Sequence, residues 1–485
     1  MKKIGRTILA VVILLSCCIT FSACSEKKDT GVCYNIEVEL IDNTLFGKMG
    51  FYYTNTSENA IDELKFNLYA NAYREGAKYS PVSAGTQYRA YPNGVNYGNI
   101  KINKVYTSDA ILEYNVSGLD QNILVVSLSK AIYPEQSVNI VIEYEIVVAD
   151  VISRLGINEK TINLANFYPI LCAYEDGKGF YECVYYSHGD PYYSQVADYN
   201  VKITLDKEYV VAGSGSIIGK SESIDKNTFT FTLQNARSFC LVLSKEFDIL
   251  TEKVGDTRVN YYFYDDENAK AHLDVAVKSI KLFSSLFGTY PYKEYSVVQT
   301  KFVQGGMEFP ALVMISDDLG DAYGEVIVHE TAHQWWQTLV GNNEIEHAFL
   351  DEGLAEYSVV LFYERYSEYG FNRQKLMQVS HDTYKVFCSV SDKLYGKVDT
   401  KMLRGLGEFK SEYEYVNMAY VKPCIMYDML RITIGDKMFF KGLSKYFNQY
   451  MYKNVGPYEI VGVFEKIGAD ANGFFQSFYD GKVII

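Results

Sequence analysis

The sequence predicts a multidomain α+β protein, with a β domain over residues 33–250 followed by a mixed α/β and helical domain over residues 251–485. The chain has 485 residues, and 48% of them are hydrophobic, which is more than a single hydrophobic core accommodates. Apolar residues alternate at every second position before about residue 250 and recur at helical spacing after it. An aromatic content of 15% excludes an intrinsically disordered chain.

Short alternating runs predict the β domain. In these runs apolar residues are separated by mostly polar ones, as in Tyr34–Leu40, Val138–Tyr144 and Val201–Leu205. Clusters of turn residues such as Gly213–Ser216 lie between the runs. A period of two with polar partners is typical of antiparallel sheets that expose one face to solvent, so we expect antiparallel sheets here.

Helical spacing predicts most of the second domain. Apolar residues recur at intervals of three and four over 268–287 and 323–340. Two strand-like runs lie between these segments, at 296–302 and 311–315. After residue 349 nearly every periodic segment is helical, through 420–434 and on to 475–479. Ligand sites form in clefts, and we expect the chemistry in the cleft of this mixed domain.

The first 23 residues are predicted to be an export signal, because a basic N-terminus precedes an apolar stretch that is short for a membrane span. Phe21-Ser22-Ala23-Cys24 resembles a bacterial lipobox, with Phe21 where the motif usually has Leu. We therefore expect a lipoprotein signal peptide over 1–23, a lipid anchor on Cys24, a short tether over 24–32, and a location on the outer face of a bacterial cell membrane. A plain cleaved signal peptide is the alternative.

Charge and cysteine content exclude several classes of protein. The 46 Lys and Arg against 60 Asp and Glu give a net charge of −14. No basic run long enough to neutralise a phosphate backbone is present, so no nucleic-acid partner is expected. No Cys-x-x-Cys pair indicates a thiolate zinc site or a redox motif. Cys172 and Cys183 form either a bridge across a hairpin or two free buried thiols.

The strongest chemical signal is His329-Glu330-Thr331-Ala332-His333 within a helical run. Histidines at i and i+4 project from one helix face, so both imidazoles reach one ion, and Glu330 lies beside them. Glu352 follows His333 by 19 positions, far enough for a loop and a second helix to return its carboxylate. Two histidines and one glutamate leave a fourth position open, as a catalytic zinc site requires. A helix with two surface histidines is the simpler alternative.

Together with Gly305-Gly306-Met307-Glu308-Phe309-Pro310, this motif resembles the zinc aminopeptidases of the aminopeptidase N family, of gluzincin type. The resemblance is densest over residues 295–365 and extends over the mature chain. It implies an N-terminal β-saddle followed by a thermolysin-like α/β catalytic domain. Only about 65 residues follow Tyr420, so we expect no C-terminal superhelical domain and a more open site that admits longer peptides.

The resemblance also implies roles for individual residues. His329, His333 and Glu352 match the ligands of one Zn(2+) per chain, and Glu330 matches the general base. Glu308, with Gly305, Gly306 and Met307 beside it, matches the carboxylate that binds the free α-ammonium of a peptide substrate. Phe309 departs from the family, which has Asn at this position; the departure bears on the shape of the pocket.

Tyr420 is the best match for the family's tyrosine that stabilises the oxyanion. Its context, Tyr420-Val421-Lys422-Pro423, has Pro where the family has Gly, which a first helical turn tolerates. Three other tyrosines remain candidates for this role, namely Tyr413, Tyr415 and Tyr427. Glu356 is expected either to orient a ligand histidine or to be solvent-exposed. Asp351 is expected to be solvated or N-terminal to the helix, without a catalytic role.

These observations predict a zinc-dependent aminopeptidase that hydrolyses the N-terminal peptide bond of peptides with a free N-terminus. Two alternatives remain. A thermolysin-like endopeptidase would share every zinc ligand but cleave blocked peptides. A surface binding lipoprotein would retain the peptidase fold without turnover. The residue that completes the amine pocket is expected from the β domain, between Asn166 and Tyr193.

Overall fold

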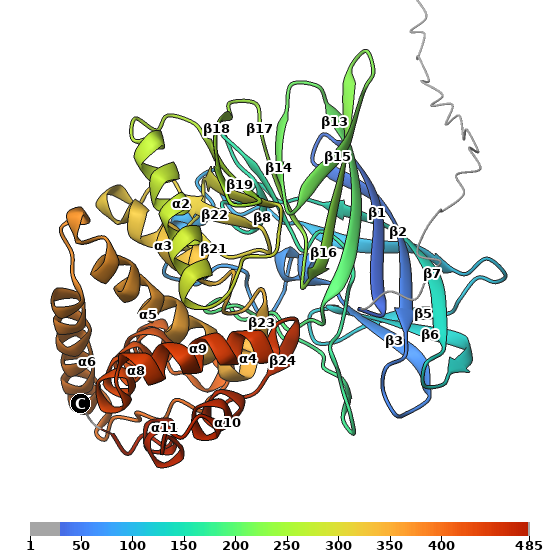
Figure 1. Ribbon diagram of the computed structural model, residues 1–485. Helices are drawn as coiled ribbons and strands as arrows, with labels where there is room; N and C mark the ends of the chain where they lie inside the picture. The colour runs from blue at the N-terminus through green and yellow to red at the C-terminus, as the bar shows by residue number, and fades with distance from the viewer. Residues whose placement is uncertain (1–29, 484–485) are drawn as a thin grey trace, which may run out of the picture.

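The computed structural model describes residues 30–483. It consists of a β-sheet domain and a helical domain that pack side by side (Figure 1). The predicted signal peptide, the Cys24 anchor and most of the 24–32 tether lie outside the described residues. Within the described part of the chain, no helix is long and apolar enough to cross a membrane.

A seven-stranded sheet is the largest element of the β domain. Alternate residues of β1, such as Ile36 and Val38, are buried, while Glu37 and Glu39 between them are more exposed, as the alternating pattern predicts. All neighbours are antiparallel except β1 and β13, which pair in parallel. The strand order is β15 (Ser216–Glu222), β16 (Lys226–Ala236), β13 (Ala197–Asp206), β1 (Val32–Ile41), β2 (Thr44–Thr54), β7 (Ser137–Val147) and β4 (Asn99–Tyr106).

Two four-stranded sheets complete most of this domain. One has the order β10 (Ile170–Leu171), β3 (Ile61–Asn67), β6 (Ile123–Ile132) and β5 (Tyr114–Ser117). The other has the order β14 (Val210–Gly213), β17 (Cys240–Ser244), β9 (Ile162–Ala165) and β8 (Leu155–Ile157). A small hairpin joins β11 (Tyr174–Glu175) to β12 (Gly179–Phe180). Cys172 and Cys183 near this hairpin are both free and buried.

The second domain begins with a mixed five-stranded sheet. Its order is β18 (Asp248–Val254), β19 (Thr257–Phe263), β20 (Glu294–Thr300), β22 (Leu312–Ser316) and β21 (Gly306–Met307). β20 pairs in parallel with β19 and β22, and every residue of β20 is buried. The short edge strand β21 pairs in antiparallel with β22. This edge carries the Gly305–Glu308 segment into the interior of the domain.

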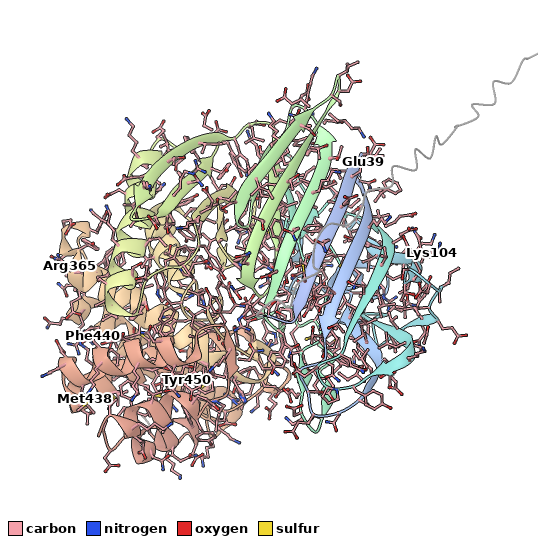
Figure 2. The ribbon with its side chains drawn as sticks, turned by 45° about the vertical axis from the view of Figure 1, so that its right-hand side comes forward. Glu39, Lys104, Arg365, Met438, Phe440 and Tyr450 are labelled. Carbon is pink, nitrogen blue, oxygen red and sulfur yellow. The ribbon has the colours of Figure 1, made fainter. Side chains whose placement is uncertain are left out.

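Helices form the rest of the second domain. The helix α3 (Tyr323–Ala332) packs against α2 (Ala269–Leu286) and α5 (Phe349–Arg365), and α5 also packs against α8 (Lys422–Ile434). The outer helices are α6 (Arg373–Tyr395), α9 (Asp436–Tyr450), α10 (Glu459–Lys466) and α11 (Asn472–Tyr479). Figure 2 places Arg365 and Met438 on this helical side, and Glu39 and Lys104 on the sheet side.

The predicted helix over 323–340 is wrong beyond Ala332. The chain turns after His333, where Thr338 donates its N–H to the carbonyl of His333 at 3.0 Å. It then forms β23 (Val340–Asn342), which pairs in parallel with β24 (Lys453–Val455). The apolar spacing continues through the turn because Trp335, Trp336 and Leu339 are buried in the core, and periodicity does not distinguish such a turn from a helix.

Arg237 joins the two domains. Its buried guanidinium donates to the carbonyls of Ser194 at 3.2 Å, Gln337 at 2.8 Å and Lys453 at 2.7 Å, and it also bonds to the side chain of Asn454. Ser194 belongs to the β domain and the other three residues to the second domain. The guanidinium therefore fixes the relative position of the two halves.

We expect Arg237→Met to destabilise the protein by on the order of 3 kcal/mol, because buried carbonyls would lose their donors. For a chain of this length, the melting temperature should fall by about 3 °C. Thermal unfolding followed by circular dichroism measures the shift. Arg89→Met is the control, since Arg89 pairs with Asp318 at the surface and is 42% exposed. Equal shifts for the two variants would contradict the role of Arg237.

Candidate active site

Helices α3 and α5 bring the three predicted metal ligands together. Nε2 of His329 lies 3.1 Å from Nε2 of His333 and 3.2 Å from Oε2 of Glu352, and the latter two atoms are 3.1 Å apart. The three atoms thus form a nearly equilateral triangle. Ligand atoms around a tetrahedral zinc ion at about 2.0–2.1 Å lie about 3.3 Å apart. The spacing and the donor types therefore fit zinc.

The charge of the surrounding residues also fits a divalent cation. The set His329, His333 and Glu352 lines a cavity of about 410 Å³. Among the described residues that line this cavity, seven are Asp or Glu and one, Arg154, carries a fixed positive charge. Burying so many carboxylates is costly without a compensating cation, and a zinc ion would supply the missing charge.

The outward nitrogens of the two histidines are held by other groups. Nδ1 of His329 lies 3.2 Å from Oε2 of Glu356, and Nδ1 of His333 lies 3.0 Å from the carbonyl oxygen of Trp336. Such contacts fix the orientation of a metal-binding imidazole. Of the two alternatives for Glu356, the structure therefore favours contact with a ligand histidine.

The expectation for Asp351 is wrong. Its carboxylate is buried, accepts a hydrogen bond from Nδ2 of Asn342 at 2.8 Å and lies 3.9 Å from Nδ1 of His333. The helix α5 begins at Phe349, so Asp351 lies in its first turn, which packs beneath His333 rather than facing solvent.

Glu330 lies in the same cavity with one carboxylate oxygen free. It is buried, and its Oε2 has no hydrogen-bond partner within residues 30–483. Burial raises the pKa of Glu330 to about 8, with Glu308 acting in the same direction. A Cβ atom at Gly306 would lie 2.1 Å from Oε1 of Glu330, so a side chain at position 306 would displace this carboxylate.

Glu308 follows the edge strand β21. The turn before it needs glycine at position 305, where φ is +93°, and Met307 is buried. Oε1 of Glu308 is buried and has no partner in the described part of the chain. A ligand atom of Glu308 lies within 4.8 Å of His333 and Asp351. The cavity therefore has an unpaired carboxylate near His333.

The loop that follows Glu308 is fastened to the end of α3. Gln334 donates from Nε2 to the carbonyl of Phe309 at 3.1 Å, and its Oε1 accepts from the N–H of Ala311 at 2.9 Å. Phe309 itself is buried, in the place where the related family has Asn. The main chain of Phe309 is thus held by the amide of Gln334, while its side chain packs in an apolar cluster.

Tyr420 is the tyrosine that contacts the metal-ligand set. Its hydroxyl donates to Oε1 of Glu352, and its ring stacks on His329 with centroids 5.8 Å apart. Burial raises the pKa of the Tyr420 hydroxyl above its usual value of 10, and Glu352 acts in the same direction, so the hydroxyl remains a donor. Tyr415 also lines the cavity, 3.5 Å from the Tyr420 hydroxyl, whereas Tyr413 and Tyr427 do not line it.

Two charged residues of the cavity come from the β domain and were not identified from the sequence. Arg154 precedes β8, and Asp190 lies in the loop before β13; their side chains form a buried ion pair. Asp190 lies in the range where a β-domain residue was expected, but no local pattern distinguishes it from other loop carboxylates. His188 also lines the cavity.

The His-Glu-x-x-His helix with a third carboxylate ligand has the donor pattern of a zinc peptidase site. Residues 271–478 match the peptidase family M1 domain.

Two curated proteins resemble part of the chain. "Probable aminopeptidase 2" of Sulfurisphaera tokodaii is 24% identical over 281 residues, which cover 53% of this chain and 35% of that protein. "Aminopeptidase M1-B" of Oryza sativa subsp. japonica is 28% identical over 212 residues, which cover 41% of this chain and 23% of that protein. The chain thus spans about a third or less of the length of these curated relatives.

Solved structures confirm the two-domain fold. A crystal structure of a mutant M1 zinc metallopeptidase from Deinococcus radiodurans has a TM-score of 0.67 and 15% identity, covering 94% of this chain and 96% of that chain. Another structure, of a mutant bound to a Tyr-Ser-Ala substrate, has a TM-score of 0.64 over 94% of this chain and 95% of that chain. At this identity the likeness establishes the fold: a β domain followed by a helical domain.

Proposed function

We propose that this protein is a zinc-dependent aminopeptidase that releases the N-terminal residue of peptides. One observation carries the proposal: a metal-ligand triad and two unpaired buried carboxylates, Glu330 and Glu308, line one cavity. The names of the relatives, which include aminopeptidases, and the tripeptide bound by the Deinococcus enzyme support it.

Each residue has a defined task in this proposal. When bound by His329, His333 and Glu352, zinc supplies a Lewis acid that acidifies water and polarises the scissile carbonyl. Glu330 takes the proton from the attacking water and transfers it to the leaving amine. The Tyr420 hydroxyl donates a hydrogen bond to the carbonyl oxygen as negative charge develops on it.

Glu308 makes the enzyme an exopeptidase in this proposal. A free α-ammonium pairs with its buried carboxylate, whereas a blocked N-terminus leaves that carboxylate desolvated and unpaired. The position of Glu308, near His333, then places the first peptide bond of the substrate at the metal. If an internal peptide bond lay at the metal, the substrate would have no α-ammonium next to Glu308 to pair with its carboxylate.

A matched pair of substrates tests the proposed activity. The purified protein should hydrolyse a leucyl-coumarin amide and lose this activity with a chelator, while the N-acetylated form of the same amide should be hydrolysed far more slowly. Cleavage of N-acetylated peptides at internal bonds would instead support the endopeptidase. Bound zinc without hydrolysis of either substrate would support a binding protein.

Glu308→Gln should raise KM for the free aminoacyl amide by about 10²-fold, because the neutral amide loses the charge-assisted bond to the ammonium. The N-acetylated amide should be affected far less, so the ratio of kcat/KM between the two substrates measures the role of Glu308. Glu346→Gln is the matched control, since Glu346 lies on α4 (Glu344–His347) and does not line the cavity. An unchanged ratio in Glu308→Gln would contradict the assignment.

We also propose that the protein is exported and anchored by a lipid on Cys24, on the outer face of a bacterial membrane. The basic N-terminus, the apolar stretch and Ala23-Cys24 support this proposal. Labelling with a radioactive fatty acid should mark the wild type and not Cys24→Ala. Equal labelling of both proteins would contradict it.

A further inference from the structure

The segment that carries Glu308 is held from the β domain on one side. Nε of Arg154 donates to Sδ of Met307 at 3.0 Å, and Met307 directly precedes Glu308. Nη2 of the same guanidinium pairs with Asp190 and lies 3.3 Å from the carbonyl oxygen of Gly189. The side chain of Arg154 is only 6% exposed. One buried cation thus joins two loops of the β domain to the edge strand β21.

The geometry of this contact is specific to arginine. A guanidinium is a rigid planar fork whose donors address several acceptors at fixed angles, whereas a lysine ammonium is a single point. The ring of Tyr192 also lies 5.6 Å from the guanidinium carbon, which limits movement of the plane. Arg154 therefore restrains Met307 and Asp190 relative to each other.

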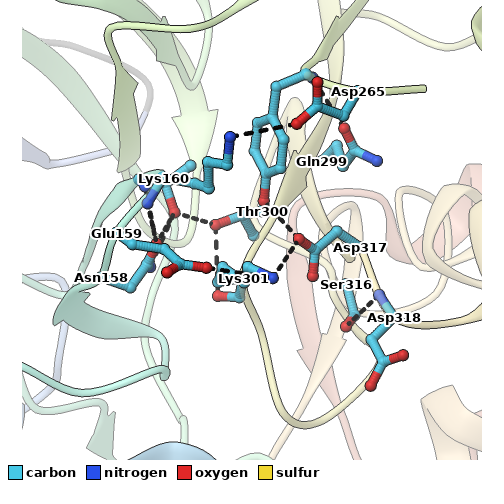
Figure 3. A network of polar contacts seen from close by, with 12 residues as sticks. Asn158, Glu159, Lys160, Asp265, Gln299, Thr300, Lys301, Ser316, Asp317 and Asp318 are labelled. Atoms are coloured by element: carbon cyan, nitrogen blue, oxygen red, sulfur yellow. Dashed lines mark hydrogen bonds and ion pairs between the residues drawn. The ribbon is translucent and has the colours of Figure 1, made fainter. Parts of the chain in front are cut away.

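A second contact between the domains holds the other end of this segment (Figure 3). The Thr300 hydroxyl, at the end of β20, donates to Oδ1 of Asn163 at 2.7 Å and lies 2.6 Å from the Thr161 hydroxyl. Lys301 pairs with Asp317 at 3.0 Å and lies 3.7 Å from Glu159. The chain from Thr300 to Met307 is thus fixed to the β domain at both ends.

Asn163 connects the two contacts. Its Nδ2 donates to the carbonyl of Ser153 at 3.0 Å and to that of Lys301 at 3.3 Å. Ser153 directly precedes Arg154, so the same buried amide supports the arginine and the start of the segment that leads to Glu308. The two contacts form one continuous connection from the β domain to the segment that carries Glu308.

We propose that Arg154 is a positioning residue through which the β domain sets the position of Glu308, and hence the preference for free N-termini. This inference rests on the proposed aminopeptidase function. Arg154 acts through Met307 and does not itself bind the ammonium, which its positive charge would repel. A displacement of about 1 Å at a binding group costs up to about 10²-fold in rate, so a small shift of Glu308 is sufficient for a measurable effect.

The test uses the full chain with Arg154→Lys, which keeps the charge beside Asp190 but loses the planar fork. KM for the free aminoacyl amide should rise about tenfold, with kcat and bound zinc changed by about twofold or less. Met307→Leu, which removes the sulfur acceptor and keeps the volume, should raise KM in the same direction. Arg74→Lys is the matched control, because Arg74 pairs with Asp120 in the β domain and does not line the cavity.

Three results would overturn the inference. The first is a KM in Arg154→Lys equal to that of the wild type. The second is a loss that appears equally in kcat, zinc content and melting temperature, which indicates general destabilisation. The third is a rise in KM for Asp190→Asn that is far larger than the rise in Arg154→Lys and Met307→Leu, which indicates that Asp190 binds the ammonium directly. If the wild type hydrolyses the free and the N-acetylated amide equally, the proposed aminopeptidase function is wrong. That result concerns the wild type, whereas the three results above concern only the role of Arg154.

Discussion

Replacing Glu330 by glutamine should lower kcat by about 10³-fold to 10⁴-fold while leaving one zinc ion bound per chain. The physical reason is that Gln keeps the shape of Glu330 but cannot accept the proton of the attacking water. The carboxylate does not belong to the His329, His333 and Glu352 triangle, so the metal ligands remain intact. Steady-state kinetics on the free aminoacyl amide and elemental analysis of the same samples give the two readouts.

Gly306→Ala tests the position of Glu330 independently, because Gly306 lies against the Glu330 carboxylate. The added methyl carbon would lie 2.1 Å from Oε1 of Glu330, so it must displace the carboxylate even though the base itself is unchanged. We expect a lower kcat than in the wild type, with zinc retained. Wild-type kcat in Glu330→Gln would contradict the assignment of Glu330 as the base. Loss of zinc in Glu330→Gln would instead indicate that Glu330 maintains the structure of the metal site.

The chemistry that depends on local sequence could be predicted. His329 and His333 lie four positions apart, and any α-helix presents two residues at this spacing on one face. Glu308 was identified differently, from the resemblance of Gly305–Pro310 to the signature of the aminopeptidase N family. What the sequence did not predict is how tightly Gly306 approaches Glu330, because that contact joins two elements whose packing is not encoded in either one.

The residues that escaped prediction depend on long-range contacts. Arg154 and Asp190 lie 36 positions apart, and nothing in the sequence pairs them or places them beside Met307. The end of α3 at Ala332 follows from the pairing of β23 with β24, whose strands are separated by more than a hundred residues. Asp351 was expected in solvent because a carboxylate in a first helical turn is usually exposed. Its burial follows from the packing of α5 against α3.

The β domain contributes more to the cavity than its sequence suggests. Alternating residues predicted its sheets, and the alternation of buried and exposed residues along β1 agrees with that pattern. The loops between the strands carry no such pattern, yet they supply Arg154, His188 and Asp190 to the cavity. Loops positioned by a rigid scaffold commonly carry functional residues. The loops of the β domain line the cavity only together with residues of the second domain, so their sequence alone does not reveal this role.

Removing one metal ligand should abolish zinc binding and activity together. In His333→Ala we expect zinc affinity to fall by more than about 10²-fold, because even the contacts that orient a ligand contribute about 10-fold to 100-fold. Wild-type protein stripped with a chelator should recover full activity when zinc is added, whereas His333→Ala should not. His188→Ala is the control, since His188 lines the cavity but bonds to the carbonyl of Leu406 rather than to the triad.

The melting temperature gives a readout of the same site that does not depend on catalysis. Zinc at about 1,000 times its Kd stabilises the folded state by about 4 kcal/mol, and the buried carboxylates Asp190, Glu308 and Asp351 add a repulsion that the cation offsets. Stripping zinc should therefore lower the melting temperature of the wild type and change that of His333→Ala little. Equal zinc content in the two proteins would show that the ion binds elsewhere, and the proposed mechanism would then be wrong.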